Sequence, residues 1–421
     1  MLSKKSVFAF ALLLCVVVPG VGQTKSDEDI VRITTNLVQV DAVVTKNGKI
    51  VTDLKAEDFE IFEDGRRQEI TSFAYISNVS SNAGDSARPA ANTKDTNAPF
   101  DPNTPPPLPP EVKGRTIAIL IDDLGLSAES MAQMRRQLRT FIDEQLNPND
   151  LLAIVMASKA YKGIKPQFTS NKRSLDEAWE QIVWYQCSRV GVKTMPKLGG
   201  SSGTGCNKYS ATPEQSYRSI RLTLQAMTNL PGRKSMVVFS DSMPLREDEL
   251  MVKPGAGVTD ADGERGESNN YMGSLDKLTE AAIRASVVIY AVDAGGLQVT
   301  SLTAADEFSN TGAGGIEAYK KLLHGRSAMI DMNRDGARII TKGTGGYLVQ
   351  DQNNFQLDGI LNDQRGYYLI GYRPTTETFN KRFHNLKARV KKSGMTVRTR
   401  SGFFGMSEDD AKRLKEANRK D

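Results

Sequence analysis

The sequence predicts an α/β protein with a doubly wound, mainly parallel, Rossmann-like sheet covered by helices on both faces, together with a small β-sandwich-like module. Between residues 114 and about 350, apolar runs typical of buried strands alternate with segments whose apolar residues recur at helical spacing. Strand patterns at residues 30–77 and 366–404 flank this region. Each is too small to bury a core alone, so we expect the two to pair in one module.

The first 22 residues have the pattern of a secretory signal peptide. Lys4 and Lys5 precede an apolar stretch from Val7 to Val18, and small residues follow up to Gly22, after which we place the cleavage. No other apolar run reaches the 18 or so residues that cross a bilayer, so no transmembrane segment is predicted. The mature chain is expected to be secreted or periplasmic.

Charge and composition argue against a nucleic-acid partner. The net charge of +5 falls to +3 on cleavage, because the signal peptide removes Lys4 and Lys5 and no acidic residue. The remaining lysines and arginines are spread along the chain rather than gathered in a basic stripe.

The boundaries follow from these patterns and from a Ser-, Asn-, Asp- and Pro-rich stretch that cannot bury a core. Asn47-Gly48 and Asp64-Gly65 predict hairpin turns in the N-terminal part. The expected parts are a signal peptide (1–22), an N-terminal β segment (23–80), a Pro-rich linker (81–112), the α/β domain (113–350), a C-terminal β segment (351–405) and a charged tail (406–421).

Within the α/β domain each strand is a short apolar run and each helix has an apolar face. The expected strands are 116–121, 151–156, 234–240 and 287–292. The expected helices begin at Ser127 and span Asn171–Ile182, Thr212–Asn229 and 274–285. A further helix is expected to begin at about Asp331 and end at Gly343.

Two cysteines remain after cleavage, Cys187 and Cys206, because Cys15 lies in the signal peptide. In an oxidising compartment such a pair predicts a disulfide. The bridge would close a long insertion that contains the Gly-rich stretch 199–205.

Asp122 and Asp241 each follow an apolar run that predicts a buried strand. Ligands of doubly wound sheets bind outside the carboxyl ends of the strands. Two carboxylates delivered there are a candidate site for a divalent cation, which prefers oxygen ligands. The alternative is structural, because an Asp after a strand often caps a helix or holds a loop.

Four motifs, in this order, resemble the von Willebrand factor A-related proteins abundant in Acidobacteria, over roughly residues 30–405. They are Asp53-Leu-Lys-Ala-Glu-Asp-Phe-Glu-Ile-Phe-Glu-Asp-Gly65, Pro231-Gly-Arg-Lys-Ser-Met-Val-Val-Phe-Ser-Asp241, Thr344-Gly-Gly346 and Tyr367-Tyr-Leu-Ile-Gly-Tyr-Arg-Pro374. The resemblance implies an exported protein with a von Willebrand A domain, which usually binds protein partners through a metal-ion-dependent adhesion site.

That adhesion motif is Asp-x-Ser-x-Ser after the first strand, a Thr in a later loop and an Asp after the fourth strand. If Asp122 is its first residue, Leu124 and Leu126 replace the serines. If Asp123 is first, Gly125 replaces one serine and Ser127 remains.

Thr212 is the best match for the Thr of the motif, with Thr204 as the second candidate, and Asp241 matches its last Asp. The resemblance therefore implies a degenerate site that would hold Mg²⁺, Mn²⁺ or Ca²⁺ through Asp122, Asp123, Ser127, Thr212 and Asp241. Ser127 and Thr212 also suit helix N-caps.

The leading interpretation is a binding protein that presents this edge to a protein or cell-surface ligand. The alternative is a metal-free structural component of a cell-envelope assembly. Enzymatic activity is not expected, since no nucleophile and base are placed together. Two histidines, His324 and His384, cannot supply three imidazoles to zinc and are expected to be incidental surface residues.

Overall fold

The computed structural model describes residues 37–77, 114–190, 211–230, 233–247, 269–297, 313–352, 354–355, 357–375 and 380–405. The predicted signal peptide, the Pro-rich linker, residue Cys206 and the charged tail lie outside these residues. All described residues belong to one compact unit, Asn36–Asp421.

The central sheet consists of five parallel strands in the order β12-β11-β8-β6-β7. They are β6 (Thr116–Ile121), β7 (Leu151–Met156), β8 (Lys234–Ser240), β11 (Val287–Asp293) and β12 (Leu348–Val349). Counted along the chain this is the order 2-1-3-4-5 of a doubly wound sheet, which reverses between β6 and β8. The crevice outside the carboxyl ends of these two strands is where such sheets bind ligands.

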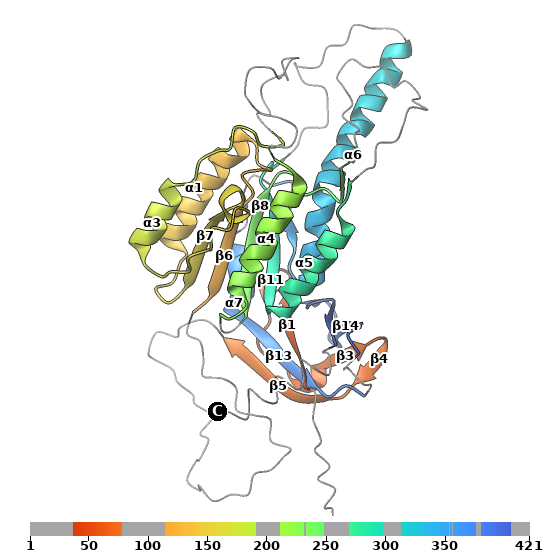
Figure 1. Ribbon diagram of the computed structural model, residues 1–421. Helices are drawn as coiled ribbons and strands as arrows, with labels where there is room; N and C mark the ends of the chain where they lie inside the picture. The colour runs from red at the N-terminus through yellow and green to blue at the C-terminus, as the bar shows by residue number, and fades with distance from the viewer. Residues whose placement is uncertain are drawn as a thin grey trace, which may run out of the picture. The chain divides into compact units, whose positions relative to one another are not determined.

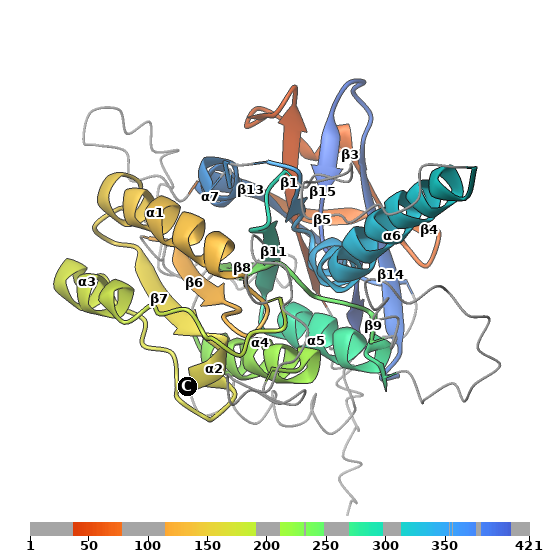
Figure 2. The same cartoon turned by 90° about the horizontal axis from the view of Figure 1, so that it is seen from above.

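Two cores lie on opposite faces of this sheet because side chains alternate along a strand. From β6, Ile117, Ile119 and Ile121 enter one core, and Ala118 and Leu120 enter the other. The first core includes residues of α1 (Ala128–Glu144), α3 (Lys172–Glu180) and α7 (Leu357–Arg365). The second includes residues of α2 (Ala157–Ala160), α4 (Pro213–Met227), α5 (Met272–Arg284) and α6 (Ala313–Thr344). Figures 1 and 2 show α1 and α4 on opposite sides of the sheet.

Two antiparallel sheets combine strands from the N- and C-terminal segments. The first contains β1 (Val38–Lys46), β2 (Lys49–Ile50), β5 (Ile70–Ser77), β13 (Gly366–Tyr372) and β15 (Thr396–Arg398). The second contains β3 (Phe59–Glu63), β4 (Arg66–Gln68), β14 (Phe383–Val390) and β16 (Gly402–Phe404), and a 3₁₀ turn (Ala56–Asp58) precedes β3. A further short pair is β9 (Arg246–Glu247) and β10 (Asn269–Asn270). The predicted pairing of the two segments is confirmed by β1 with β13 and β3 with β14.

The strands of the α/β domain match the sequence prediction closely. Strands β6, β7 and β8 have the predicted bounds, and β11 extends one residue further, to Asp293. Asn47 and Asp64 have positive φ of 50° and 48°, each followed by a positive-φ glycine, as the two predicted hairpin turns require. The helix predicted to begin at about Asp331 and end at Gly343 is the last part of α6, which continues to Thr344. The predicted start is wrong, because α6 begins at Ala313.

The two histidines differ in environment. His324 is exposed, as expected. The expectation of a surface position is wrong for His384, which is 5% exposed. It lies on β14, and the ring of Phe403 stacks on its imidazole at a centroid distance of 5.0 Å. Among the described residues, no helix is both long and apolar enough to cross a bilayer.

Candidate functional site

Three buried aspartates lie at the carboxyl ends of adjacent strands. Asp122 follows β6, Asp241 follows β8, and Asp293 is the last residue of β11. They are 1%, 7% and 5% exposed. The first two flank the point where the strand order reverses, as the sequence predicts, and Asp293 extends the row by one strand.

The guanidinium of Arg189 lies in the crevice beside Asp122. Its Nη2 donates to Asp122 Oδ2 at 2.9 Å and to the carbonyl oxygen of Ser242 at 2.8 Å. Its Nη1 donates to the carbonyl oxygen of Thr212 and to Ser216 Oγ, both at 3.0 Å. The side chain is 11% exposed. One cation therefore joins the end of β6 to the N-terminus of α4 and to the loop after β8.

Two hydroxyls complete the surroundings of Asp122. Ser216 Oγ donates to Asp122 Oδ1 at 2.5 Å, and Ser240 Oγ donates to Asp122 Oδ2 at 2.7 Å. Ser216 lies in the first turn of α4, and Ser240 is the last residue of β8. The carboxylate thus accepts two hydroxyl hydrogen bonds besides the bond from Arg189, so its charge is well solvated by the protein.

Gly125 makes room for this arrangement. A Cβ at this position would lie 2.4 Å from Arg189 Nη2, 2.4 Å from Asp122 Oδ2 and 2.9 Å from Ser240 Oγ. Any side chain here would therefore displace the guanidinium or the carboxylate. If Asp123 is the first residue of the motif, Gly125 stands where the motif has a serine, and a serine side chain would not fit beside Arg189 and Asp122.

Leu124 and Leu126 belong to the hydrophobic cores on opposite faces of the sheet. They are 1% and 0% exposed. If Asp122 is the first residue of the motif, these two leucines occupy the serine positions as packing residues that offer no oxygen.

Ser127 and Asp241 hold the start of α1. Ser127 is the N-cap, and its Oγ accepts from the backbone N–H of Ser130 at 3.2 Å. The backbone N–H of Ser127 donates to Asp241 Oδ2 at 3.0 Å. The Asp241 carboxylate therefore lies at the positive end of the α1 dipole, where a negative charge is stabilised.

Asp123 contacts the start of α2, whereas Asp122 contacts Ser216 of α4. Asp123 Oδ1 accepts from the backbone N–H of Ser158 at 2.9 Å, at the start of α2. Burial raises the pKa of the Asp123 carboxyl to about 6, against the hydrogen bonds from Ser158, and the charge of Asp122 raises it further. The two adjacent carboxylates thus have different partners: Asp122 binds Arg189, and Asp123 accepts from the start of α2.

Thr212 is the N-cap of α4 and forms a capping box with Gln215. Its backbone N–H donates to Gln215 Oε1 at 3.0 Å. Its carbonyl oxygen, rather than its hydroxyl, is the group that contacts Arg189. The structure therefore places Thr212 at the start of α4, with its carbonyl oxygen in contact with Arg189. Thr204, the second candidate for the motif, lies outside the described residues.

A second arginine neutralises Asp293. Arg334 of α6 donates from Nε to Asp293 Oδ2 at 2.7 Å, and its Nη2 donates to Asp351 Oδ1 at 2.8 Å. Burial raises the pKa of Asp293, while the charge and hydrogen bond of Arg334 lower it. Arginine is thus the counter-charge at two of the three strand ends.

The residues around Asp122, as they are arranged, do not fit a divalent cation. Arg189 Nη2 is in direct contact with the carboxylate oxygen that such a cation would need. A guanidinium and a metal ion that both contacted this carboxylate oxygen would repel each other, because two positive charges would then lie close together. Each of the five predicted ligands has a hydrogen-bonding contact within the protein, by its side chain or its backbone.

Sequence reasoning missed Arg189, Ser216, Asp293 and Arg334. Asp293 carried a usable signal, because it ends an apolar run just as Asp122 and Asp241 do. Arg189 lies in an irregular stretch two residues after Cys187, where neither periodicity nor a known motif marks it. Cys206 lies outside the described residues, so the predicted Cys187–Cys206 bridge stays a prediction.

Large exposed apolar side chains gather at or beyond this edge of the sheet. In the described part of the chain they are Ile164, Val183, Met272, Leu297 and Met329. Ile164 follows α2, which begins directly after β7, and Met272 is the first residue of α5. Leu297 follows β11.

The positions of Val183 and Met329 follow from the contacts of residues near them in the chain. Val183 precedes Trp184, whose Nε1 donates to the carbonyl oxygen of Leu126 at 3.2 Å. Met329 precedes Arg334 on α6, a helix of 32 residues, about 48 Å long. Arg334 meets the end of β11, and Met329 lies five residues nearer the start of α6. Figure 1 shows that the N-terminal part of α6 projects past the sheet.

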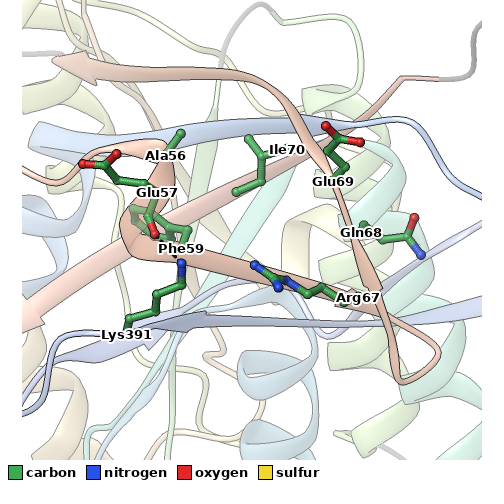
Figure 3. Close-up of a pocket in the computed structure, with 8 residues that line it drawn as sticks. All are labelled: Ala56, Glu57, Phe59, Arg67, Gln68, Glu69, Ile70 and Lys391. Carbon is green, nitrogen blue, oxygen red and sulfur yellow. Dashed lines mark hydrogen bonds between the residues drawn. The ribbon is translucent and has the colours of Figure 1, made fainter.

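A separate hollow of about 470 Å³ lies on the sheet of β3 and β4 (Figure 3). It is lined by Ala56, Glu57, Phe59, Arg67, Gln68, Glu69, Ile70 and Lys391. Its charges are mixed, and Lys391 Nζ already donates to the carbonyl oxygen of Glu57 at 2.7 Å. This composition favours no single ligand chemistry.

No family model matches the chain, and no curated protein matches it. Similar solved structures include an aerotolerance-related membrane protein from Bacteroides fragilis, at 13% identity and a TM-score of 0.30, over 60% of this chain and 98% of that one. Another is the von Willebrand A domain of SpRpn10, at 13% identity and a TM-score of 0.25, over 59% and 94%. A third is the human COPII-coat protein Sec24c, at 8% identity and a TM-score of 0.26, over 70% and 44%.

With TM-scores of 0.30 or less, none of these similarities carries an argument about what this chain binds or does. The strand order shows a doubly wound α/β domain, and Asp122 and Asp241 lie at the carboxyl ends of two of its strands.

Proposed function

We propose that this chain is a protein-binding protein whose α/β domain presents the carboxyl edge of its parallel sheet to a protein or cell-surface ligand, with no cation at Asp122. The position of Arg189 is the observation that supports a site without a metal ion. Its guanidinium already supplies the positive charge that a cation would bring to Asp122, through a contact of 2.9 Å.

The exposed apolar side chains favour a protein as the partner. Single exposed apolar residues are common on protein surfaces. Here Val183, Met272 and Leu297 have exposed fractions of 61%, 42% and 66%. Leu297 follows the end of β11, and the neighbours of the other two, Trp184 and Tyr271, contact the loops that follow β6 and β8. The carboxyl edge of the sheet is where doubly wound folds bind their ligands. Apolar anchors around a polar centre are the usual composition of a protein interface.

In this proposal Arg189 keeps its contacts when the partner binds, and these contacts hold the carboxyl edge in one conformation. The guanidinium fixes Asp122, the N-terminus of α4 and the loop after β8 in one arrangement. A surface held in this way loses little conformational freedom when a partner binds. Binding through this edge is therefore expected to survive chelation, in contrast to a metal-dependent adhesion site.

Site-specific photo-crosslinking of the full chain in its native cells tests the proposal. A photoreactive residue replaces Val183 or Met272 at the carboxyl edge. As a matched control it replaces Asn149, an exposed residue next to the start of β7 at the opposite edge. The expected result is one protein crosslinked from both carboxyl-edge positions, in buffer with or without EDTA, and not from Asn149. Crosslinks that form only from Asn149, or that vanish in EDTA, would contradict the proposal.

We further propose that the chain is exported after cleavage behind Gly22 and that Cys187 pairs with Cys206. The sequence pattern of residues 1–22 and the pairing rule for exported cysteines support these two points. N-terminal sequencing of the native protein, and its mass before and after reduction and alkylation, test them separately.

We also propose that the two antiparallel sheets act as one sandwich-like module. Val40 of the first sheet and Ile61 and Leu386 of the second belong to a single hydrophobic cluster, which supports this reading. The alternative function is a metal-free scaffold, in which this module makes the contacts. A partner crosslinked from exposed Lys387 on β14, but from neither carboxyl-edge position, would favour that alternative.

A further inference from the structure

Three metal-binding side chains converge at one end of the second antiparallel sheet. They are Glu63 at the end of β3, Asp64 in the turn that follows, and His384 on β14. One ligand atom from each lies within 4.8 Å of the others. His384 Nδ1 is 3.1 Å from Glu63 Oε1 and 3.0 Å from Asp64 Oδ2. The strand pair β3–β14 brings them together across 320 residues of sequence.

The second polar atom of each side chain is held by a neighbour. Tyr372 donates its hydroxyl to Glu63 Oε2 at 2.8 Å. The backbone N–H of Asn385 donates to Asp64 Oδ1 at 2.8 Å. His384 Nε2 lies 3.2 Å from Asn380 Oδ1. Outer contacts of this kind orient the ligands of metal sites, and an imidazole ligand usually donates its other N–H to an oxygen.

Glu63 adds an observation that hydrogen bonding inside the protein does not explain. The residue is 2% exposed, and within the described part of the chain its Oε1 has no hydrogen-bond partner. The nearest group is His384 Nδ1, which already makes a hydrogen bond with Asp64 Oδ2. One imidazole N–H thus faces two carboxylate oxygens, although a buried carboxylate oxygen without a donor is costly.

We propose that Glu63, Asp64 and His384 bind one divalent transition-metal ion of the zinc type. Glu63 Oε1, Asp64 Oδ2 and His384 Nδ1 would be the ligands of this ion. Their bonds to the ion would replace the present contacts between the His384 imidazole and the two carboxylates. Asp64 is 44% exposed, which gives the ion a route from solvent and leaves water as a further ligand. An imidazole with two carboxylates suits Zn²⁺ better than the hard ions Mg²⁺ and Ca²⁺.

The distances agree with this assignment. Zinc binds nitrogen and carboxylate oxygen at about 2.0–2.2 Å, so two of its ligands lie about 3.4 Å apart in tetrahedral geometry and about 2.9 Å apart in octahedral geometry. The observed separations of 3.0 and 3.1 Å lie between these values.

The ion would fasten the N-terminal segment to the C-terminal segment. Glu63 pairs with Leu386 in the ladder of β3 and β14, and the three ligands lie at the end of this ladder. Because the ligands come together only in the folded chain, binding would raise the stability of the native state. The site lies on the antiparallel sheets and is separate from the carboxylates at the edge of the parallel sheet.

Equilibrium dialysis of the untagged mature chain, residues 23–421, tests the proposal. The protein is first stripped with a chelator, then dialysed against graded Zn²⁺ in excess Mg²⁺, and bound zinc is measured by elemental analysis. The expected result is one tightly bound Zn²⁺ per chain and a raised midpoint of thermal unfolding. Asp64→Asn preserves the acceptor for Asn385 and suits the positive φ of 48°, so this variant should fold.

The variants give the decisive comparison. Asp64→Asn and Glu63→Gln are each expected to weaken zinc binding at least tenfold, and Tyr372→Phe about tenfold through loss of an outer contact. Asp276→Asn, an exposed carboxylate on α5, and Asp122→Asn should leave zinc binding unchanged. The proposal would be overturned if the parent did not bind zinc tightly. It would also be overturned if Asp64→Asn and Glu63→Gln bound zinc as tightly as the parent. Loss of binding in Asp122→Asn alone would move the ion to the parallel sheet and count against the proposed function instead.

Discussion

Arg189 Nη2 lies 2.9 Å from Asp122 Oδ2, at the point where the strand order of the parallel sheet reverses. The carboxylate is 1% exposed and the arginine side chain 11% exposed. In this position the arginine satisfies a buried charge that a von Willebrand A adhesion site would satisfy with a cation.

Replacing Arg189 by Met is expected to destabilise the fold by about 3 kcal/mol, because it leaves the buried Asp122 carboxylate without its counter-charge. Urea unfolding at neutral pH measures this cost. The double variant Arg189→Met/Asp122→Asn should recover part of it, since the uncompensated charge is then gone as well. A cost below about 1 kcal/mol for Arg189→Met would mean that the pair contributes little.

Gly125→Ala is expected to cost about 2 kcal/mol, because the added methyl group would lie 2.4 Å from both Arg189 Nη2 and Asp122 Oδ2. The matched control is Gly273→Ala on α5, where nothing lies within 4 Å of the added Cβ. That variant should be neutral or more stable by about 0.5 kcal/mol, since alanine favours a helix. Equal midpoints of unfolding for the two variants would show that the crevice is not tightly packed.

Asp123 predicts a pH dependence of stability. Burial raises its pKa from 3.8 to about 6 in the folded state. The folded chain therefore holds this proton more tightly than the unfolded chain does. Its contribution to stability is greatest below pH 3.8 and is lost as the pH rises to about 6. The loss amounts to about 3 kcal/mol at most.

Asp123→Asn should remove this loss, since the Asn Oδ1 can still accept from the backbone N–H of Ser158. Its gain in stability over the parent is expected to be larger at pH 7 than at pH 4. Urea unfolding of both proteins at the two pH values measures the difference and cancels the titration of other groups. Parallel pH profiles would contradict the raised pKa.

Much of the parallel sheet could be predicted because its strands are continuous apolar runs. Each of β6, β7 and β8 contains an apolar run that marks the position of the strand, although β6 begins at Thr116 and β8 begins at Lys234 and ends at Ser240. The hairpin at Asp64-Gly65 follows from its turn residues, which adopt positive φ. Pairing of the two β segments follows from their size, since neither could bury a core alone.

The contents of the crevice could not be predicted in the same way. Asp122 was found because it ends a strand, whereas Arg189 reaches it from an irregular segment 67 residues away. Ser127 and Thr212 were correctly placed at helix starts, but a sequence does not show whether a hydroxyl caps a helix or faces a crevice. His384 was expected at the surface because the register that buries it beside Glu63 depends on residues about 320 positions apart.

The most direct measurement is thermal unfolding of the mature chain, residues 23–421, in EDTA and then in excess Mg²⁺, beside Arg189→Ala. For the parent, the midpoint is expected to be the same in EDTA and in Mg²⁺, because Arg189 already neutralises Asp122. In Arg189→Ala, Mg²⁺ is expected to raise the midpoint, since oxygens of Asp122, Ser216 and Ser240 are left around the vacated space. A rise in the parent that Asp122→Asn abolishes would contradict the account and restore a metal-dependent site.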